Sequence, residues 1–325
     1  MKEETIEISG KEYTKVVEKM VEIEDGVEQV CMNGVQAPSE VPQEEKSLVV
    51  TEHTNEDVLH AITEDDEIYA SDWKKRVVII TGASCGIGLE TARRFVLYAD
   101  VVYNLDLVRQ DDDNINFIKT DITNPESVAN ALQKIWDKED QIDIVINNAG
   151  IGFAGSAEGA TLAEIEKIIN TNFIGTAIVS AAVIPYLREQ KRGKIIQIAT
   201  QTGIRPKLFQ SLYNASKAAT IAYSKTLASE VKPFNIKVTS IIFSNVKTTF
   251  TESRVKNKED DKVYKYRLAK AISRAEYDEQ NGKEPEWVAR KLFTLSNKRK
   301  FKPVTIFGAK ERGGYFFRKR GKVKG

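Results

Sequence analysis

Short apolar runs alternate with segments of helical spacing from residue 76 to residue 307, and this alternation constrains the fold most strongly. The run from Arg76 to Thr81 is mostly apolar and β-branched, as expected of a strand that is covered on both faces. Residues 101–107, 115–119, 142–147, 194–199, 236–242 and 304–307 are typical of further strands. The pattern predicts an α/β fold, with a single Rossmann-type, doubly wound parallel sheet of about seven strands and helices on both faces.

Charge is distributed unevenly along the chain. Residues 1–70 contain 19 Asp and Glu against 5 Lys, a net of −14, so the remainder carries +15 to reach the total of +1. We therefore predict an acidic N-terminal extension over 1–70 and a Rossmann domain over 71–325. That domain ends in a basic tail, 296–325. We expect part of the extension to pack on the basic body of its own or a neighbouring subunit.

Composition argues against several other classes of protein. The net charge of +1 gives no overall attraction to nucleic acid. Only two histidines, His53 and His60, are present, which argues against a histidine-based triad or a histidine-rich metal site, so no metal is predicted. Two cysteines imply no disulfide framework and fit a reducing compartment.

Targeting signals are also not evident from the sequence. No apolar stretch follows the N-terminal Met-Lys-Glu-Glu, so we expect no signal peptide and a cytoplasmic protein. The longest apolar run, 174–187, is too short to span a bilayer and contains Pro185. We therefore expect no membrane span.

A glycine-rich loop, 81–88, follows the first predicted strand and opens a helix. Glycines let the backbone approach a pyrophosphate closely, and a helix N-terminus supplies free N–H groups to hold it. The spacing is Gly-x3-Gly-x-Gly and differs from the standard dinucleotide fingerprint, so a tight turn without a ligand is the alternative for this motif alone. The cofactor contacts predicted here are Gly82, Ser84, Gly86, Ile87 and Gly88.

An aspartate ends the next predicted strand. Asp106 lies twenty residues after Gly86, where an acid binds the adenosine ribose hydroxyls and disfavours a 2′-phosphate. This position predicts NAD as the cofactor. Arg109 is near enough in sequence to weaken that discrimination, and a solvent-facing aspartate at a strand end is the alternative.

Three motifs occur in a fixed order: Thr81-Gly82-x3-Gly86-Ile87-Gly88, then Asn147-Asn148-Ala149-Gly150, then Tyr213-x3-Lys217. In these motifs and their spacing the chain resembles the short-chain dehydrogenase/reductase family over roughly residues 75–250. The resemblance implies an NAD(H)-dependent enzyme that interconverts an alcohol and a ketone. Tyr213-x3-Lys217 by itself is most often ordinary helix surface, so the combination of motifs is what makes the resemblance specific.

The resemblance also assigns the site residues. It implies that Tyr213, Lys217, Thr200 and Asn172 form the catalytic group. It implies further cofactor contacts from Asp121, Ile122, Asn148, Ala149, Gly150, Val246 and Thr248, together with Tyr213 and Lys217. Thr200 stands where the family usually has serine, and Phe243-Ser244 stands where it often has Pro-Gly.

The chemistry of ketone reduction explains why such residues are needed. The cofactor supplies a hydride, and a second group must supply a proton to oxygen. A free tyrosine has a pKa of about 10. Lys217 is four residues after Tyr213 in a helical stretch, so both lie on one helix face. Its charge and that of an oxidised nicotinamide favour tyrosinate, so we predict a lowered pKa for Tyr213.

The substrate is predicted from two loops. In the family they wall the substrate pocket, and here they contain the apolar residues Ile204, Leu208, Phe209, Leu212 and Phe250. Apolar residues there predict a bulky apolar substrate such as a steroid, with plain loop packing as the alternative. The acidic extension is similar to that of bacterial hydroxysteroid dehydrogenases acting at the 20β position.

Other functions stay open on the sequence. An acyl-thioester or small-ketone reductase would use the same fold, and a catalytically idle NAD(H)-binding regulator would use only its cofactor site. Tyr213 and Lys217 argue against the regulator. By analogy with the family, we expect a homo-oligomer, either a dimer or a tetramer.

Overall fold

The structure is a computed structural model that describes residues 2–8, 11–17, 75–256 and 263–308. Strands β1 (Lys2–Ile8) and β2 (Lys11–Val17) pair antiparallel, with Lys2 opposite Val17, and belong to a unit separate from the main body. Most of the predicted acidic extension and the end of the basic tail lie outside the described residues. The packing of the extension therefore stays a prediction.

Seven parallel strands form the main sheet in the order β11-β9-β8-β6-β3-β4-β5. They are β3 (Val77–Thr81), β4 (Val101–Asp106), β5 (Asn116–Lys119), β6 (Ile144–Asn147), β8 (Gly193–Ile198), β9 (Ile236–Ile242) and β11 (Val304–Ile306). The sheet confirms the predicted fold class. The chain order reverses direction between β3 and β6, and open parallel sheets bind ligands beyond the carboxyl ends at such a point.

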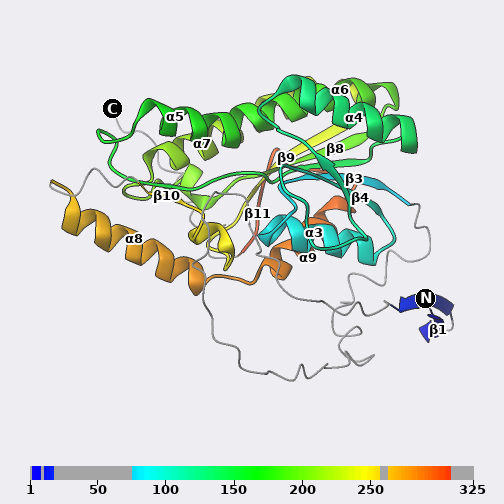
Figure 1. Ribbon diagram of the computed structural model, residues 1–325. Coiled ribbons are helices and arrows are strands. Elements are labelled where there is room, and N and C mark those ends of the chain that lie inside the picture. Colours follow the sequence, from blue (N-terminus) through cyan, green and yellow to red (C-terminus); the bar gives the residue numbers. More distant parts are fainter. Residues whose placement is uncertain (1, 9–10, 18–74, 257–262, 309–325) are drawn as a thin grey trace. The chain divides into compact units, whose positions relative to one another are not determined.

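Helices cover both faces of this sheet (Figure 1). The helices of the main body are α3 (Gly86–Leu97), α4 (Pro125–Glu139), α5 (Leu162–Ile169), α6 (Gly175–Glu189), α7 (Ser211–Glu230) and α9 (Pro285–Ser296), and α8 (Lys265–Gln280) lies beside the sheet. One buried core lies between the sheet and α4, α6 and α7, and another lies between the sheet and α3 and α9. Because both sheet faces are buried, the strands are mostly apolar.

Local sequence signals set several helix boundaries. Asn124 caps α4 by accepting hydrogen bonds from the backbone N–H groups of Glu126 and Ser127, and Pro125 occupies the first helical position. Thr161 and Glu164 form a reciprocal capping box at the start of α5. These caps fix where each helix begins after its loop.

Helices α5 and α6 are joined by a π-helical turn, η2 (Asn170–Ile174), into one continuous helix over 162–189. By length and composition alone, this helix is long and apolar enough to cross a membrane. In the fold, its α6 half buries Val179, Val183 and Leu187 in the core shared with α4. The absence of a membrane span stays a prediction.

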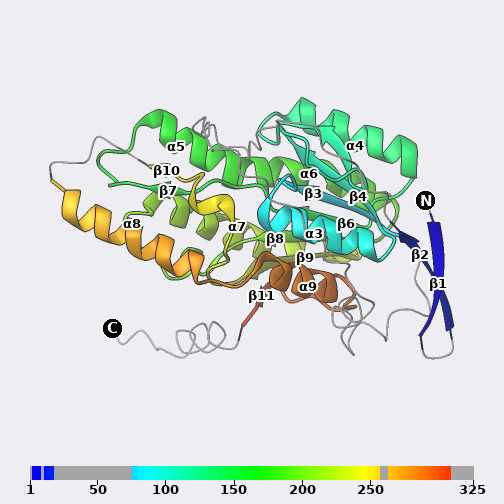
Figure 2. The same cartoon turned by 60° about the horizontal axis from the view of Figure 1, so that its bottom comes forward.

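A segment inserted between β9 and α9 carries the remaining small elements. It contains the 3₁₀ turn η5 (Thr249–Thr251), strand β10 (Val255–Lys256) and helix α8. Strand β10 pairs parallel with β7 (Phe153–Ala154) outside the main sheet. The two ends of the segment meet, because Lys283 N–H donates to the Asn245 carbonyl at 3.0 Å and Lys247 N–H donates to the Lys283 carbonyl at 2.9 Å. Figure 2 shows α8 extending away from the sheet along the edge of the molecule.

Candidate active site

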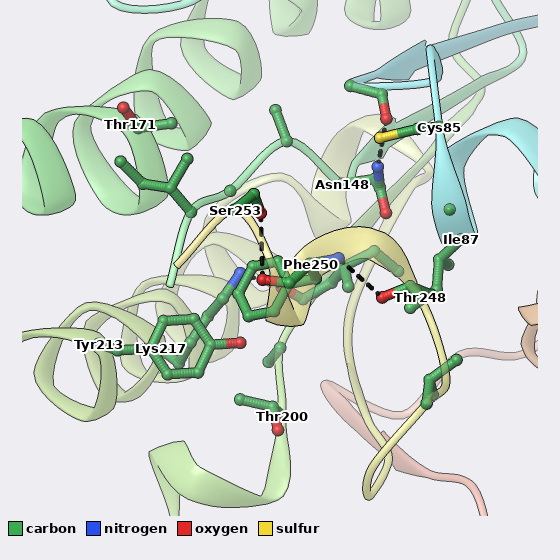
Figure 3. Close-up of a pocket in the computed structure, with 18 of the residues that line it drawn as sticks. Cys85, Ile87, Asn148, Thr171, Thr200, Tyr213, Lys217, Thr248, Phe250 and Ser253 are labelled. Atoms are coloured by element: carbon green, nitrogen blue, oxygen red, sulfur yellow. Dashed lines mark hydrogen bonds between the residues drawn. The ribbon is translucent and has the colours of Figure 1, made fainter. Parts of the chain in front are cut away.

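A cavity of about 510 Å³ opens at the carboxyl ends of the central strands. Its lining comes from the glycine loop, from the ends of β4, β6 and β8, from α7, and from the inserted segment with α8. Figure 3 shows Cys85, Ile87 and Asn148 at one end of this cavity and Tyr213, Lys217 and Thr200 at the other. The cavity thus brings together motifs that are more than a hundred residues apart in the sequence.

The glycine loop folds so closely on its neighbours that a side chain does not fit at Gly82 or at Gly88. Gly82 and Gly86 have φ angles of 68° and 56°, in the left-handed region. A Cβ atom on Gly82 would lie 2.8 Å from Ala149 Cα. A Cβ atom on Gly88 would lie 2.2 Å from the Gly82 carbonyl oxygen and 2.5 Å from Asn148 Nδ2. The resulting cradle at the start of α3 fits a pyrophosphate, which needs close backbone approach and free N–H groups.

Hydrogen bonds from neighbouring strands hold the loop in place. Asn148 Nδ2 donates to the Gly82 carbonyl at 2.8 Å, and the Thr81 hydroxyl accepts from the Asn148 and Ala149 N–H groups at 3.0 and 3.1 Å. Ala83 N–H donates to Asn104 Oδ1 at 2.9 Å. Sequence reasoning missed the buried Asn104, because one polar residue in an apolar strand gives no motif.

Asp106 lines the cavity at the end of β4, as predicted. Its Oδ1 accepts from Leu107 N–H at 2.7 Å, and its Oδ2 accepts from Ser84 N–H at 3.3 Å. These contacts fix the carboxylate beside the glycine loop. The Arg109 guanidinium, which is close in sequence, donates to Asp113 at 2.8 Å on the surface and does not line the cavity.

Tyr213 and Lys217 lie on one face of α7, as their spacing predicts. Lys217 Nζ donates to the Ile198 carbonyl at 3.0 Å and lies 5.9 Å from the centre of the Tyr213 ring. Burial lowers the pKa of Lys217 to about 8. The balance between the charged and neutral forms of the Lys217 amine is therefore sensitive to the charge of a group that binds beside it.

Burial raises the pKa of Tyr213, with Glu279 adding to the rise and Arg254 opposing it. This direction, for the chain without a cofactor, is opposite to the lowered pKa that was predicted for the enzyme with oxidised nicotinamide bound. That prediction requires two positive charges, those of Lys217 and of an oxidised nicotinamide, so the lowered pKa stays a prediction for the enzyme with its cofactor. Tyr213 is therefore protonated and has a proton to donate.

Thr200 lines the cavity near Tyr213, where Figure 3 shows both side chains at the same end. It follows β8 and precedes the short turn η3 (Gln201–Gly203). Thr200 and Tyr213 therefore contribute to the same end of the cavity. Its predicted hydrogen bond to a substrate oxygen stays a prediction.

Asn172 lies behind the cavity wall and is fully buried in the π-helical turn η2. Its Oδ1 accepts from Ile151 N–H at 2.8 Å, and its Nδ2 donates to the Ile151 carbonyl at 2.9 Å and to Ser216 Oγ at 3.0 Å. The side chain thus joins the loop after β6 to α7. The water that family resemblance places at Asn172 stays a prediction.

Most predicted site residues are brought together. Those that line the cavity are Gly82, Gly86, Ile87, Asp106, Asp121, Ile122, Asn148, Ala149, Gly150, Thr200, Tyr213, Lys217, Val246 and Thr248. Ser84, Gly88 and Asn172 are not among the lining residues. Ser84 donates to the Val108 carbonyl and Gly88 packs on Gly82, so they support the lining from behind. The Asp121 carboxylate also accepts from Thr123 N–H and Oγ1, which fixes its turn.

The substrate end of the cavity differs from the apolar wall that was predicted. Phe250 lines it, but four other apolar residues of that prediction do not: Ile204, Leu208, Phe209 and Leu212. Leu208 is 60% exposed, and Phe209 packs edge-on against Tyr264. Polar residues missed by the prediction line the cavity instead, namely Lys167, Lys207, Gln210, Ser253 and Glu279. Long-range folding decides which loop residues face inward, and the loop sequence carries no period that reveals it.

Comparison with known proteins adds a family match. The model of the family described as short chain dehydrogenase matches residues 76–259. A 3-ketodihydrosphingosine reductase of Bacteroides thetaiotaomicron is 36% identical over 217 residues, which cover 65% of this chain and 79% of that protein. Human retinol dehydrogenase 8 is 30% identical over 190 residues, which cover 54% of this chain and 60% of that protein.

Solved structures show the same fold. The ligand-free aldohexose dehydrogenase of Thermoplasma acidophilum aligns with a TM-score of 0.62 at 26% identity. The alignment covers 72% of this chain and 92% of that one.

Proposed function

This chain belongs to the short-chain dehydrogenase family, and from that premise we propose that it interconverts a secondary alcohol and a ketone on a bulky apolar substrate with NAD(H). Membership makes it an oxidoreductase that binds a nicotinamide cofactor. The observation that carries the proposal is the cavity that joins the glycine cradle to Tyr213, Lys217 and Thr200.

The residues of the chain have separate roles in this proposal. When bound, the cofactor supplies or accepts the hydride. Tyr213, held protonated by burial, gives its proton to the carbonyl oxygen in reduction and takes it back in oxidation. Thr200 orients that oxygen by hydrogen bonding. Lys217 Nζ, close to the Tyr213 ring, favours the tyrosinate that remains after proton transfer.

Asp106 supports the proposed preference for NAD(H) over NADP(H). Its carboxylate is fixed beside the cradle, and a 2′-phosphate close to it would meet like charge. We expect kcat/KM with NADH to exceed that with NADPH by about tenfold or more, since a carboxylate near one phosphate charge is worth about 1 to 4 kcal/mol. Steady-state kinetics with both cofactors, repeated on Asp106→Ser, measures this. Equal efficiency in the unaltered chain would contradict it.

The substrate class is proposed from the cavity and from the names of the relatives. Phe250 gives the substrate end of the cavity an apolar wall, beside the polar residues Lys167, Lys207, Gln210, Ser253 and Glu279. The relatives described above are named for a long-chain keto lipid and for retinol, and neither name is that of a steroid. We therefore propose a lipid ketone with a long or bulky apolar body. The hydroxysteroid predicted from the sequence remains within that class as a second candidate.

A panel of carbonyl compounds tests this proposal. NADH consumption is compared for 3-ketodihydrosphingosine, a ketosteroid, retinal, a small ketone and an acetoacetyl thioester, with Tyr213→Phe as the control for background oxidation. Turnover confined to the first three supports a lipid substrate. Turnover of the small ketone or thioester at equal efficiency would favour the alternative reductases. NADH binding without any turnover would favour a regulator.

Thr200 provides a test of the substrate end of the site. Thr200→Ser keeps the hydroxyl and removes only a methyl group, so we expect kcat/KM to stay within about threefold. Thr200→Ala removes the hydrogen bond to the substrate oxygen, and we expect a fall of about 100-fold, as for other single donors in such sites. The two variants are compared with the best substrate of the panel. Full activity in Thr200→Ala would contradict the assigned role.

A further inference from the structure

A buried ion pair joins the first part of the inserted segment, just before β10, to α8 beside the cavity. Arg254 Nη2 donates to Glu279 Oε1 at 2.5 Å and to Oε2 at 2.7 Å. The Thr251 hydroxyl donates to the same Oε2 at 2.7 Å. The Arg254 side chain is 2% exposed and that of Glu279 is 14% exposed, and Glu279 lines the cavity. The two charges are therefore screened little by water.

The pair lies close to the catalytic tyrosine. The Phe250 ring packs against that of Tyr213, with 5.6 Å between ring centres (Figure 3). A Cβ atom on Gly152 would lie 3.1 Å from the Phe250 ring and 3.3 Å from Arg254 Cγ. Phe250 and the Arg254 stem thus pack on the same glycine. Arg254 Nη1 is buried and has no hydrogen-bond partner among the described residues.

We propose that Arg254 and Glu279 are positioning residues for the reaction, a buried pair of opposite charges whose balance sets how readily Tyr213 releases its proton. This inference rests on the proposed function of Tyr213 as the proton donor. Glu279 disfavours a negative phenolate nearby, and Arg254 favours it. Neither residue needs to touch the substrate to act in this way.

Other charged groups line the same cavity as Tyr213, and substitution of the pair leaves their charges unaltered. Lys217 lies on the same helix, while Lys207 and Lys167 line the cavity from the loop before α7 and from α5. The directions of the effects on the Tyr213 pKa, upward from Glu279 and downward from Arg254, agree with the geometry. Substituting Arg254 or Glu279 therefore separates the effect of the pair on the Tyr213 pKa from the effect of these lysines.

The test is the pH dependence of alcohol oxidation, because that direction requires deprotonated Tyr213. Glu279→Gln keeps an oxygen that can accept from Thr251 but removes the negative charge, so the midpoint of the rising limb should move to lower pH. Arg254→Met removes the positive charge and should move it to higher pH. Each shift should be roughly 0.5 to 1.5 pH units, as expected for a charge in a partly dry site. Decan-2-ol with saturating NAD serves as a neutral probe.

Two further variants separate charge from structure. The double variant Arg254→Met with Glu279→Gln removes both charges and leaves none buried alone, so its midpoint should return close to that of the unaltered enzyme. Arg254→Lys keeps the positive charge, so its midpoint should also stay close to that of the unaltered enzyme. A structural role alone predicts no such return, since the double variant loses the same contacts.

A neighbouring ion pair provides the matched control. Lys256 Nζ lies 2.9 Å from Glu276 Oε1 and joins β10 to α8. These two side chains are 44% and 33% exposed, respectively. Lys256→Met and Glu276→Gln should leave the midpoint unchanged, because solvent screens exposed charges. Shifts as large as those at Arg254 and Glu279 would overturn the proposal.

A second measurement does not depend on turnover. Tyrosine labelled with carbon-13 at Cζ reports phenolate formation, and Tyr213→Phe identifies the Tyr213 signal. At about pH 11, Glu279→Gln should show more phenolate at Tyr213 than the unaltered chain. Equal titration in the two proteins, or midpoints that move in one direction in both single variants, would overturn the proposal. Failure to oxidise any alcohol would contradict only the proposed function.

Discussion

Replacing Tyr213 by phenylalanine is expected to lower kcat about 10³-fold, because the substitution removes the proton donor and leaves the ring. The phenyl group keeps the contact with Phe250 and the packing beside Ile151 and Phe153. The Tyr213 hydroxyl carries no charge before the reaction, so NADH binding should change little. Steady-state turnover and NADH titration by fluorescence, on the same preparation, separate the two effects.

The control is the melting temperature of Tyr213→Phe, which should stay within a few degrees of that of the unaltered chain because no buried contact is lost. Activity within tenfold of the unaltered enzyme would show that another group supplies the proton. Loss of NADH binding together with turnover would place the role of Tyr213 in holding the cofactor instead.

Substituting Gly88 by alanine is the second change with a large expected effect. A Cβ atom there would lie 2.2 Å from the Gly82 carbonyl oxygen and 2.9 Å from Ala83 Cα, which are backbone atoms that cannot turn away. We expect a loss of about 3 kcal/mol or more of stability, at the upper end for an overpacked site. That loss corresponds to a fall of about 6 °C or more in melting temperature. We also expect the displaced loop to bind NADH less tightly. A loss of about 2 kcal/mol in binding free energy corresponds to a fall of about 30-fold in NADH affinity.

Gly86→Ala is the matched control, since it tests backbone angle without a clash. Its Cβ would lie 3.5 Å from Thr248, an ordinary contact, but its φ of 56° disfavours a side chain by about 1 to 2 kcal/mol. Its melting temperature should therefore fall less than that of Gly88→Ala. A greater loss at Gly86 would show that the loop tolerates close packing better than it tolerates strain.

The strands were predictable because both faces of the sheet are buried. A strand covered on both sides has no polar face, so its ends are marked where apolar residues stop, and β9 matches its predicted bounds of 236–242. The ends of the other strands match or differ by at most two residues, as at β6, which begins at Ile144 where 142 was predicted. Ile142 is buried as well, but it lies before the first paired residue of the strand.

The cofactor end of the site was predictable and the substrate end was not. The glycines lie within one strand–loop–helix unit, and Tyr213 and Lys217 lie within one helix, so the geometry inside each motif follows from local spacing. Arg254 and Glu279 are 25 residues apart on different elements, and only the docking of α8 brings them together. An arginine and a glutamate in a strongly charged stretch look like ordinary solvated surface.

The closed ends of the inserted segment bear on how such a protein can acquire new substrates. Because the backbones of Asn245, Lys247 and Lys283 hydrogen-bond to one another, the chain leaves the body and returns at nearly one point. Replacing or lengthening the segment between these residues should destabilise the sheet little, since the entropy of loop closure depends only weakly on loop length. Tyr213, Lys217 and the glycine cradle all precede this point. Exchange of this segment, in evolution or in the laboratory, therefore leaves Tyr213, Lys217 and the glycine cradle in place, while Thr248 and the Arg254–Glu279 pair are exchanged with it.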